Sequence, residues 1–321
     1  MEYMPDMIDQ AVIAVRLPRL DGSGRPRCLI NSGGLSLLER QLRQLARIGI
    51  QDVQVLTSEF AVEVAAALPR MKRLPKSVKL AHSPKELAGL NEGQNRVLFL
   101  DDAIVFDDRI IRAVVDHEAQ CLIALDRGAT GVGFRQSEDL LGFGDETSFC
   151  GIAVVPSHLM ATHAHNAVHD DFWELLLKAA ANESNCAELD VTTLPLYLSD
   201  RRRDVPLMLR RVSERESADQ ATEALIAMAQ KGTLDWPAKY IHPFFENALT
   251  KALLGTSVTP NQVTLLTGVF GFGATYLFAI GHMLPALLIA LILGVLDGVD
   301  GKLARTKMLT SRLGELEHIL D

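Results

Sequence analysis

Two aspartates near the end of the chain, Asp297 and Asp300, are the residues best placed to do chemistry. They follow a long apolar stretch, because no Asp, Glu, Lys or Arg occurs between Ala252 and Leu296. Carboxylates beside hydrocarbon are costly unless a cation or another partner compensates them. We therefore interpret the pair as part of a functional site in or near a membrane.

The spacing of this segment places its small and acidic residues together. Asp297, Asp300, Gly301 and Ala304 stand at i, i+3, i+4 and i+7, which is one face of an α-helix. Carboxylate oxygens suit hard cations such as Mg²⁺ or Mn²⁺, and Gly and Ala leave room for a phosphate-bearing ligand beside the backbone. The alternative is a helix end with solvated aspartates, although Asp at a helix C-terminus opposes the macrodipole.

The same run resembles the signature of the CDP-alcohol phosphotransferases, D-x-x-D-G-x-x-A-R-x(8)-G-x(3)-D-x(3)-D. In that family an alcohol hydroxyl attacks the β-phosphorus of a CDP-linked donor and CMP is released. The resemblance implies a CDP-alcohol donor, an alcohol or polyol-phosphate acceptor, and a membrane lipid environment. The positions that match in identity and spacing are Asp297, Asp300, Gly301, Ala304, Arg305 and Gly314.

The match changes register after Gly314. Strict counting places His318 at the third acidic position, whereas a spacer shorter by one residue brings Glu317 and Asp321 to the third and fourth. We favour the shorter spacer, because an i, i+4 pair aims both side chains at one site. The resemblance then implies that Mg²⁺ or Mn²⁺ is held by Asp297, Asp300, Glu317 and Asp321, that Asp321 is also the general base, and that the CDP pocket is lined by Gly301, Ala304, Arg305 and Gly314.

Length and composition limit the remaining interpretation. A chain of 321 residues allows about two domains, and its net charge of −8 with no basic stripe argues against nucleic acid as a partner. The four cysteines have no C-x-x-C spacing, which favours reduced thiols, and residues 1–10 lack the apolar core of a signal peptide. We expect the soluble part to lie in the cytoplasm.

The first two thirds of the chain alternate between strand and helix patterns. This alternation predicts an α/β doubly wound domain with a mainly parallel sheet. Its ligands would bind at the carboxyl ends of the strands. The expected strands are 11–17, 53–57, 78–81 and 96–100, with later segments at 150–156 and 187–190, and the expected helices are 35–48, 59–68 and 109–117.

This region resembles the sugar-phosphate nucleotidyltransferases and cytidylyltransferases. The similarity lies in the run from Arg25 to Leu42 and in the strand that ends at Asp101 and Asp102. It implies CTP as a substrate, with Arg27, Asp101, Asp102 and Asp190 as nucleotide or metal ligands. A nucleotidyltransferase-like domain fused to a CDP-alcohol phosphotransferase occurs in bifunctional inositol-phosphate cytidylyltransferases joined to phosphatidylinositol-phosphate-type synthases.

Two alternative functions stay open. Val15 to Arg19 lack the glycines that cradle a triphosphate, so the domain would be a non-catalytic nucleotide-binding or regulatory module. Asp101 and Asp102 would then be loop residues that cap the helix near Arg109. In the second alternative the chain is only a membrane-anchored nucleotidyltransferase, and the Asp297 motif is incidental.

The predicted domains are a cytoplasmic nucleotidyltransferase-like domain at 1–231, a linker with an interfacial amphipathic helix at 232–258, and a transmembrane region at 259–321. Two apolar spans, 263–280 and 284–296, form the transmembrane hairpin, and the second crosses the bilayer by continuing toward Ala304. Flanking lysines and arginines predict that both ends of this hairpin lie in the cytoplasm. We therefore expect a multi-pass protein of the inner, or cytoplasmic, membrane. The family usually has six such helices; whether the chain is a piece of a longer protein, and whether it forms a homodimer, are left open.

Overall fold

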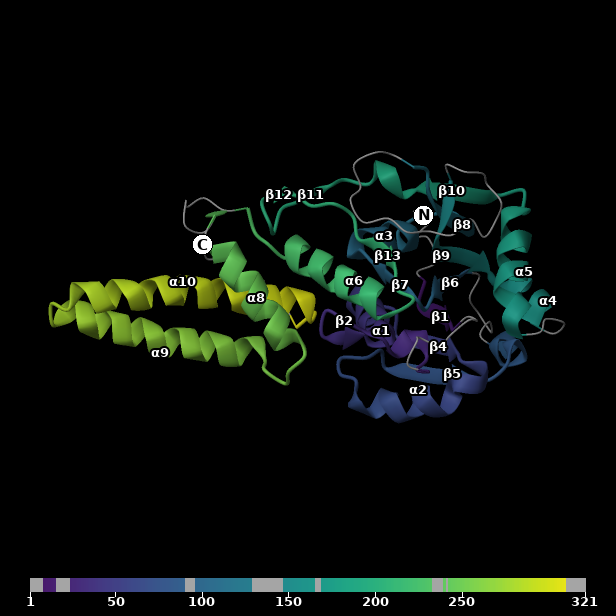
Figure 1. Cartoon of the computed structure of the whole chain (residues 1–321). Helices are drawn as coiled ribbons and strands as arrows, with labels where there is room; N and C mark the ends of the chain where they lie inside the picture. Colours follow the sequence, from purple (N-terminus) through teal and green to yellow (C-terminus); the bar gives the residue numbers. More distant parts are fainter. Residues whose placement is uncertain are drawn as a thin grey trace, which may run out of the picture. The chain divides into compact units, whose positions relative to one another are not determined.

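The computed structural model describes residues 8–15, 24–89, 96–128, 147–164, 169–232, 239–240 and 242–309 (Figure 1). The chain divides into two units, and each is described by itself. The first unit comprises Met1–Asn31, Ser36–Leu196 and Pro206–Ala218, and the second comprises Ser32–Leu35, Tyr197–Val205 and Asp219–Asp321. The domain boundaries expected at residues 231 and 258 stay predictions.

A seven-stranded sheet forms the centre of the first unit, in the order β10-β8-β9-β6-β1-β4-β5. Strands β4, β1 and β6 are parallel neighbours, β5 is parallel to β4, and β10 is parallel to β8, whereas β9 runs antiparallel to both β6 and β8. The predicted mainly parallel α/β sheet is confirmed. The strands are β1 (Gln10–Ala14), β4 (Asp52–Leu56), β5 (Ser77–Ala81), β6 (Arg96–Asp101), β8 (Cys121–Asp126), β9 (Ser148–Pro156) and β10 (Cys186–Asp190).

Helices cover both faces of this sheet. Alternate residues of β1 enter two separate apolar cores, with Ile13 on one face and Val12 on the other, as the two-residue period of a strand requires. The first core takes side chains from α1, α2 and α3, and the second takes them from α4 and α5. The bounds are α1 (Leu37–Ile48), α2 (Ala61–Ala67), α3 (Asp108–Val115), α4 (Ser157–Ala164) and α5 (His169–Ala181).

Short elements connect these layers. Helix α1 begins where the Ser36 hydroxyl accepts a hydrogen bond from the Glu39 amide at 3.2 Å, and it ends at Gly49, whose φ of 101° is left-handed. The 3-10 helices are η1 (Arg27–Leu29), η2 (Ser58–Phe60), η3 (Leu68–Arg70), η4 (Pro84–Gly89) and η5 (Val191–Thr193). The paired short strands are β2 (Asn31–Ser32) with β3 (Leu35–Ser36), β7 (Ile104–Phe106) with β13 (Leu209–Arg211), and β11 (Tyr197–Leu198) with β12 (Arg203–Asp204).

Helices dominate the second unit, which includes most of α6 (Arg215–Met228) and all of α8 (His242–Leu254), α9 (Pro260–Ala279) and α10 (Met283–Thr306). Figure 1 shows α9 and α10 side by side as a hairpin, and the two helices are in contact. A small core joins α6, α8, α9 and α10 through Ile226, Leu254, Val263, Leu296, Val299 and Leu303.

The membrane predictions agree with α9 and α10 in length and position. Helix α9 begins at a capping box made by Thr259 and Gln262, and α10 continues past the two aspartates to Thr306, as the sequence predicts. Both helices are long and apolar enough to cross a bilayer, and side chains such as Phe272 (82% exposed) face outward. Pro285 is the third residue of α10, in the first turn, where a missing amide proton costs no hydrogen bond within the helix.

Candidate functional site

The carboxylate face of α10 brings Asp297 and Asp300 together with small residues. Asp297 is exposed and Asp300 is half-buried. The Thr264 hydroxyl of α9 donates a hydrogen bond to Asp300 Oδ2 at 2.8 Å, so a neighbouring helix orients this carboxylate. This face offers two hard oxygen donors, which fit a divalent cation.

Arg305 lies on the next turn of α10, beside Gly301. A Cβ at Gly301 would approach Arg305 Nη2 to 3.0 Å, so the absence of a side chain lets the guanidinium lie along the helix. Arg305 Nε donates to the Ala229 carbonyl oxygen at 2.8 Å, just beyond the end of α6. The cation predicted to line the CDP pocket is therefore held one turn after the predicted glycine, against its bare backbone.

The opposite side of α10 carries a buried ion pair that the sequence analysis did not identify. Lys302 Nζ lies 2.8 Å from Glu246 Oε2 and 2.5 Å from Asn247 Oδ1, and both charged residues are buried, at 1% and 4% exposure. The sequence places Lys302 among the cations that flank the membrane. The signal available was Glu246 itself, an acid next to the apolar Phe244 and Phe245 in α8.

A second lysine joins the end of α10 to the turn that follows α8. Lys307 Nζ donates to the carbonyl oxygens of Leu253, Thr256 and Val258, at 3.2, 2.9 and 3.1 Å. Carbonyl groups at a helix C-terminus lack partners within the helix, and a cation satisfies them. The start of the α8–α9 connection is thus fixed to the end of the motif helix.

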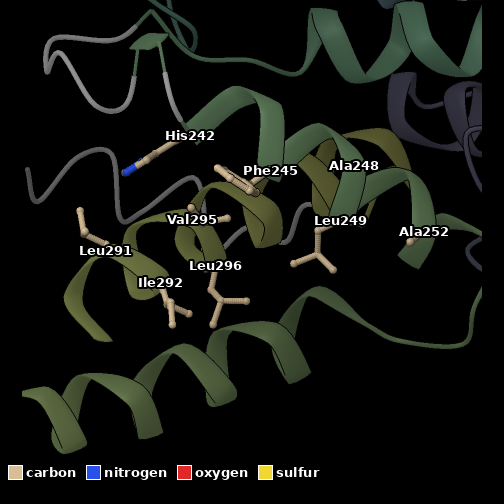
Figure 2. A pocket seen from close by; sticks show the side chains of 9 residues that line it. All are labelled: His242, Phe245, Ala248, Leu249, Ala252, Leu291, Ile292, Val295 and Leu296. Carbon is tan, nitrogen blue, oxygen red and sulfur yellow. The ribbon is translucent and has the colours of Figure 1, made fainter. Parts of the chain in front are cut away.

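An apolar cavity of about 670 Å³ lies between α8 and α10 (Figure 2). Figure 2 shows its lining along α8 from His242 to Ala252, with α10 side chains opposite. His242 is the one titratable residue in this lining. The cavity suits an apolar group and not the charged CDP donor. Its lining comprises His242, Phe245, Ala248, Leu249, Ala252, Leu291, Ile292, Val295 and Leu296.

In the first unit, Asp101 and Asp102 lie buried at the carboxyl end of β6. Asp101 Oδ2 pairs with Arg211 Nη2 at 3.2 Å, and its Oδ1 accepts from the Ala103 amide at 3.0 Å. Burial raises the pKa of the Cys28 thiol well above its usual value, and the negative charge of Asp102 raises it further. Asp102 therefore acts electrostatically on the segment that follows Arg27.

The structure corrects the expected capping role of Asp101 and Asp102. The N-cap of α3 is Asp107, whose Oδ1 accepts from the Arg109 amide at 3.0 Å. The strand β7 separates the two earlier aspartates from this helix. Capping of α3 therefore does not account for them.

Of the other two candidate ligands in this unit, Asp190 lies apart from Asp101 and Asp102. Asp190 ends β10, three strand spacings of about 4.8 Å from β6, and it accepts hydrogen bonds from the Thr192 amide at 2.9 Å and hydroxyl at 2.7 Å. Arg27 is half-buried in η1. A single metal ion could not be shared directly by Asp190 and Asp101 at a separation of roughly 14 Å along the sheet.

Several candidate residues lie outside the described residues. They are Gly314, Glu317, His318 and Asp321, and Arg16 to Arg19 of the expected triphosphate segment. Within the described ranges, no group of three or more His, Cys, Asp or Glu is placed to hold a metal ion. The carboxylate set proposed from the sequence therefore depends on Glu317 and Asp321 for completion.

The C-terminal end of the chain is similar to a known protein family. The sequence model of the CDP-alcohol phosphatidyltransferase family matches residues 257–321, which confirms the resemblance for that part of the chain. The chain is 33% identical over 108 residues to the "Bifunctional IPC transferase and DIPP synthase" of Thermococcus kodakarensis, covering 33% of this chain and 24% of that protein. It is 35% identical over 86 residues to the "Inner membrane protein YnjF" of Escherichia coli, covering 26% of this chain and 42% of that protein. The chain thus spans 24% of the length of the first relative and 42% of the length of the second.

Solved structures similar to the chain include the inositol-1-phosphate CTP transferase from T. maritima, with a TM-score of 0.44 and 10% identity over 58% of this chain and 87% of that one. Another is 4-diphosphocytidyl-2C-methyl-D-erythritol synthase from Anaerococcus prevotii, with a TM-score of 0.44 and 11% identity. This similarity covers 68% of this chain and 98% of that one.

Proposed function

We propose that this chain belongs to a membrane CDP-alcohol phosphotransferase, which transfers a phospho-alcohol group from a CDP-linked donor to an alcohol acceptor and releases CMP. The observation that carries this proposal is the carboxylate face of α10, where Asp297 and Asp300 stand beside Gly301 within the segment that matches the family. The acceptor is an alcohol or a polyol phosphate, and the product is a phospholipid or a polyol phosphodiester.

In this proposal each residue of the motif has a separate role. Asp297 and Asp300, with Glu317 and Asp321, would hold Mg²⁺ or Mn²⁺, which when bound would neutralise charge on the pyrophosphate. Gly301 and Ala304 admit the donor to the backbone of α10, and Arg305 supplies a cation for its phosphates; Gly314 continues the pocket. Asp321 takes the proton from the acceptor hydroxyl as that oxygen attacks the β-phosphorus and CMP leaves.

The proposed location is the cytoplasmic, or inner, membrane. Helices α9 and α10 are long and apolar enough to cross it, and α8 carries exposed Phe244 (74%) and Phe245 (53%) suited to the lipid interface. The first unit would lie in the cytoplasm, where CTP is available, and further membrane helices would complete a multi-pass protein. Assembly as a homodimer is a separate proposal, which cross-linking in native membranes would test.

A second activity is proposed for the first unit, namely synthesis of the CDP-alcohol from CTP and a polyol phosphate. Its support is the similarity to the Thermococcus relative, whose name describes it as bifunctional, and the buried aspartates at the carboxyl end of β6. The ion pair between Asp101 and Arg211 favours the competing possibility, a nucleotide-binding or regulatory module, because a carboxylate so engaged is less available to a metal ion. Pyrophosphate release from CTP distinguishes these two functions.

CMP release by the full-length natural protein in lipid nanodiscs tests the phosphotransferase proposal. Asp297→Asn and Asp300→Asn should each lower metal-dependent CMP release by orders of magnitude and leave membrane insertion intact. Asp219→Asn, at an exposed position in α6, is the matched control and should keep the wild-type rate. Full activity in either motif variant would refute the proposed role of the carboxylate face, and loss of insertion would show that the aspartates set topology instead.

A further inference from the structure

We infer that Glu246 is a positioning residue for the Asp297 and Asp300 carboxylates. It acts through Lys302 and fixes the rotation of α10 against α8. The inference rests on the proposed function, since it concerns how the same carboxylate face is held in place.

The first support is the burial of the ion pair. The Glu246 and Lys302 side chains are 6% and 2% exposed, and Asn247 supplies a further oxygen to the ammonium group at 2.5 Å. Burying two charges costs much of what their attraction gains, so a buried pair is weak evidence for stability. The best-attested use of such a pair is to select one register between packed elements.

The second support is the fit of the motif helix around the carboxylate. A Cβ at Gly298 would collide with the Glu246 carboxylate group, so α10 presents bare backbone at that position. Lys302 lies one turn after Gly298, on the same side of α10. Gly298 follows Asp297 directly and Lys302 lies two residues after Asp300, so the contacts of Glu246 lie within the motif itself.

The third support is the direction of the contact. At about 100° per residue, Lys302 lies roughly 140° around the helix from Asp297, so it points to α8 while the carboxylates point away. Apolar Leu296, Val299 and Leu303 of α10 also pack into the core of the second unit, but they do not by themselves select one rotation. The ion pair adds a directional contact between α8 and α10 beside the motif, in addition to the Lys307 contact at the helix end, and it fixes where the carboxylate face lies.

The experiment measures Mn²⁺ binding by electron paramagnetic resonance, and CMP release, on the full-length protein in nanodiscs. Glu246→Gln should weaken Mn²⁺ binding by about 10- to 100-fold, as loss of an orienting partner does at metal sites. CMP release at saturating Mn²⁺ should fall by about 10²-fold. Glu223→Gln is the control, since it removes an ion pair with Lys251 at 2.6 Å that is exposed on both sides; it should behave as wild type.

A second variant separates positioning from folding. Glu246→Leu with Lys302→Met replaces the pair by apolar side chains, which preserves or raises stability in other buried pairs. We expect this double variant to keep the wild-type melting temperature and still bind Mn²⁺ at least about 10-fold more weakly. Wild-type Mn²⁺ affinity in the double variant, or in a folded Glu246→Gln, would overturn the inference. If instead the wild-type protein binds Mn²⁺ but releases no CMP, the proposed function fails, while the comparison of Mn²⁺ affinities still decides the role of Glu246.

Discussion

Replacing Thr264 by valine should weaken the site without disturbing the fold. The Thr264 hydroxyl has one proton, which is shared between the Pro260 carbonyl oxygen at 3.1 Å and Asp300 Oδ2 at 2.8 Å. The charged carboxylate is the stronger acceptor. Valine keeps the shape and the branching of threonine but cannot donate, so Thr264→Val removes the bond that orients Asp300 together with the weaker contact to Pro260.

The size of the effect follows from the kind of hydrogen bond. A bond to a charged group contributes about 1.5–3 kcal/mol, which corresponds to roughly 10- to 150-fold. Thr264 is exposed in the second unit, so the lower end applies and a loss of about 10-fold in CMP release and in Mn²⁺ affinity is expected. Thr264→Ser, which retains the hydroxyl, should stay near the wild-type rate.

Thr275→Val provides the matched control on the same helix. Among the residues that the structure describes, its hydroxyl donates only to the Gly271 carbonyl oxygen, at 2.9 Å, in the same i−4 geometry. CMP release is measured against metal concentration for all three variants in nanodiscs. A Thr264→Val protein that matches Thr275→Val in rate and metal requirement would refute the assigned contact.

Three further predictions concern other parts of the chain. Glu317→Gln and Asp321→Asn should be inactive in CMP release while His318→Ala remains active, since a neutral imidazole is a poor Mg²⁺ ligand; the reverse pattern would establish the strict register after Gly314. Arg211→Met should destabilise the first unit by about 3–5 kcal/mol in denaturant titration, because it leaves Asp101 charged and buried, whereas Arg112→Met at an exposed position should not. Alkylation at neutral pH should label Cys186 before Cys28, because the hydrogen bond from the Cys121 thiol lowers the pKa of Cys186 and burial raises that of Cys28. Raising the pH should narrow the difference in labelling rate, which peptide mass spectrometry measures. Equal labelling of the two cysteines in the folded protein would contradict the two pKa shifts.

The fold was largely predictable because its signals are local. Apolar runs such as 96–100 and amphipathic runs such as 35–48 carry the two- and 3.6-residue periods that define strands and helices. The direction of β9 was not predicted, since an isolated apolar strand carries no information about its partner. The cap of α3 was misassigned because three aspartates, Asp101, Asp102 and Asp107, precede it, and only the position of β7 distinguishes them.

The candidate site was predictable on one face of α10 only. Asp297 and Asp300 share a face by spacing alone, whereas the contact between Glu246 and Lys302 joins residues 56 positions apart on different helices. No local pattern specifies such a contact, because it depends on how α8 and α10 pack. An acid in an apolar interfacial helix could have been marked as needing a partner, although its partner could not have been named.

The motif helix must therefore satisfy separate requirements on different sides of one turn. Asp297 and Asp300 face the proposed substrates, Val299 and Leu303 enter the core of the second unit, and Lys302 meets α8. Because successive residues turn by about 100°, rotating the helix to improve one contact would spoil the other two. The absence of a side chain at Gly298 and the ion pair of Lys302 therefore help to position the site in this chain, although the family signature leaves both positions unspecified.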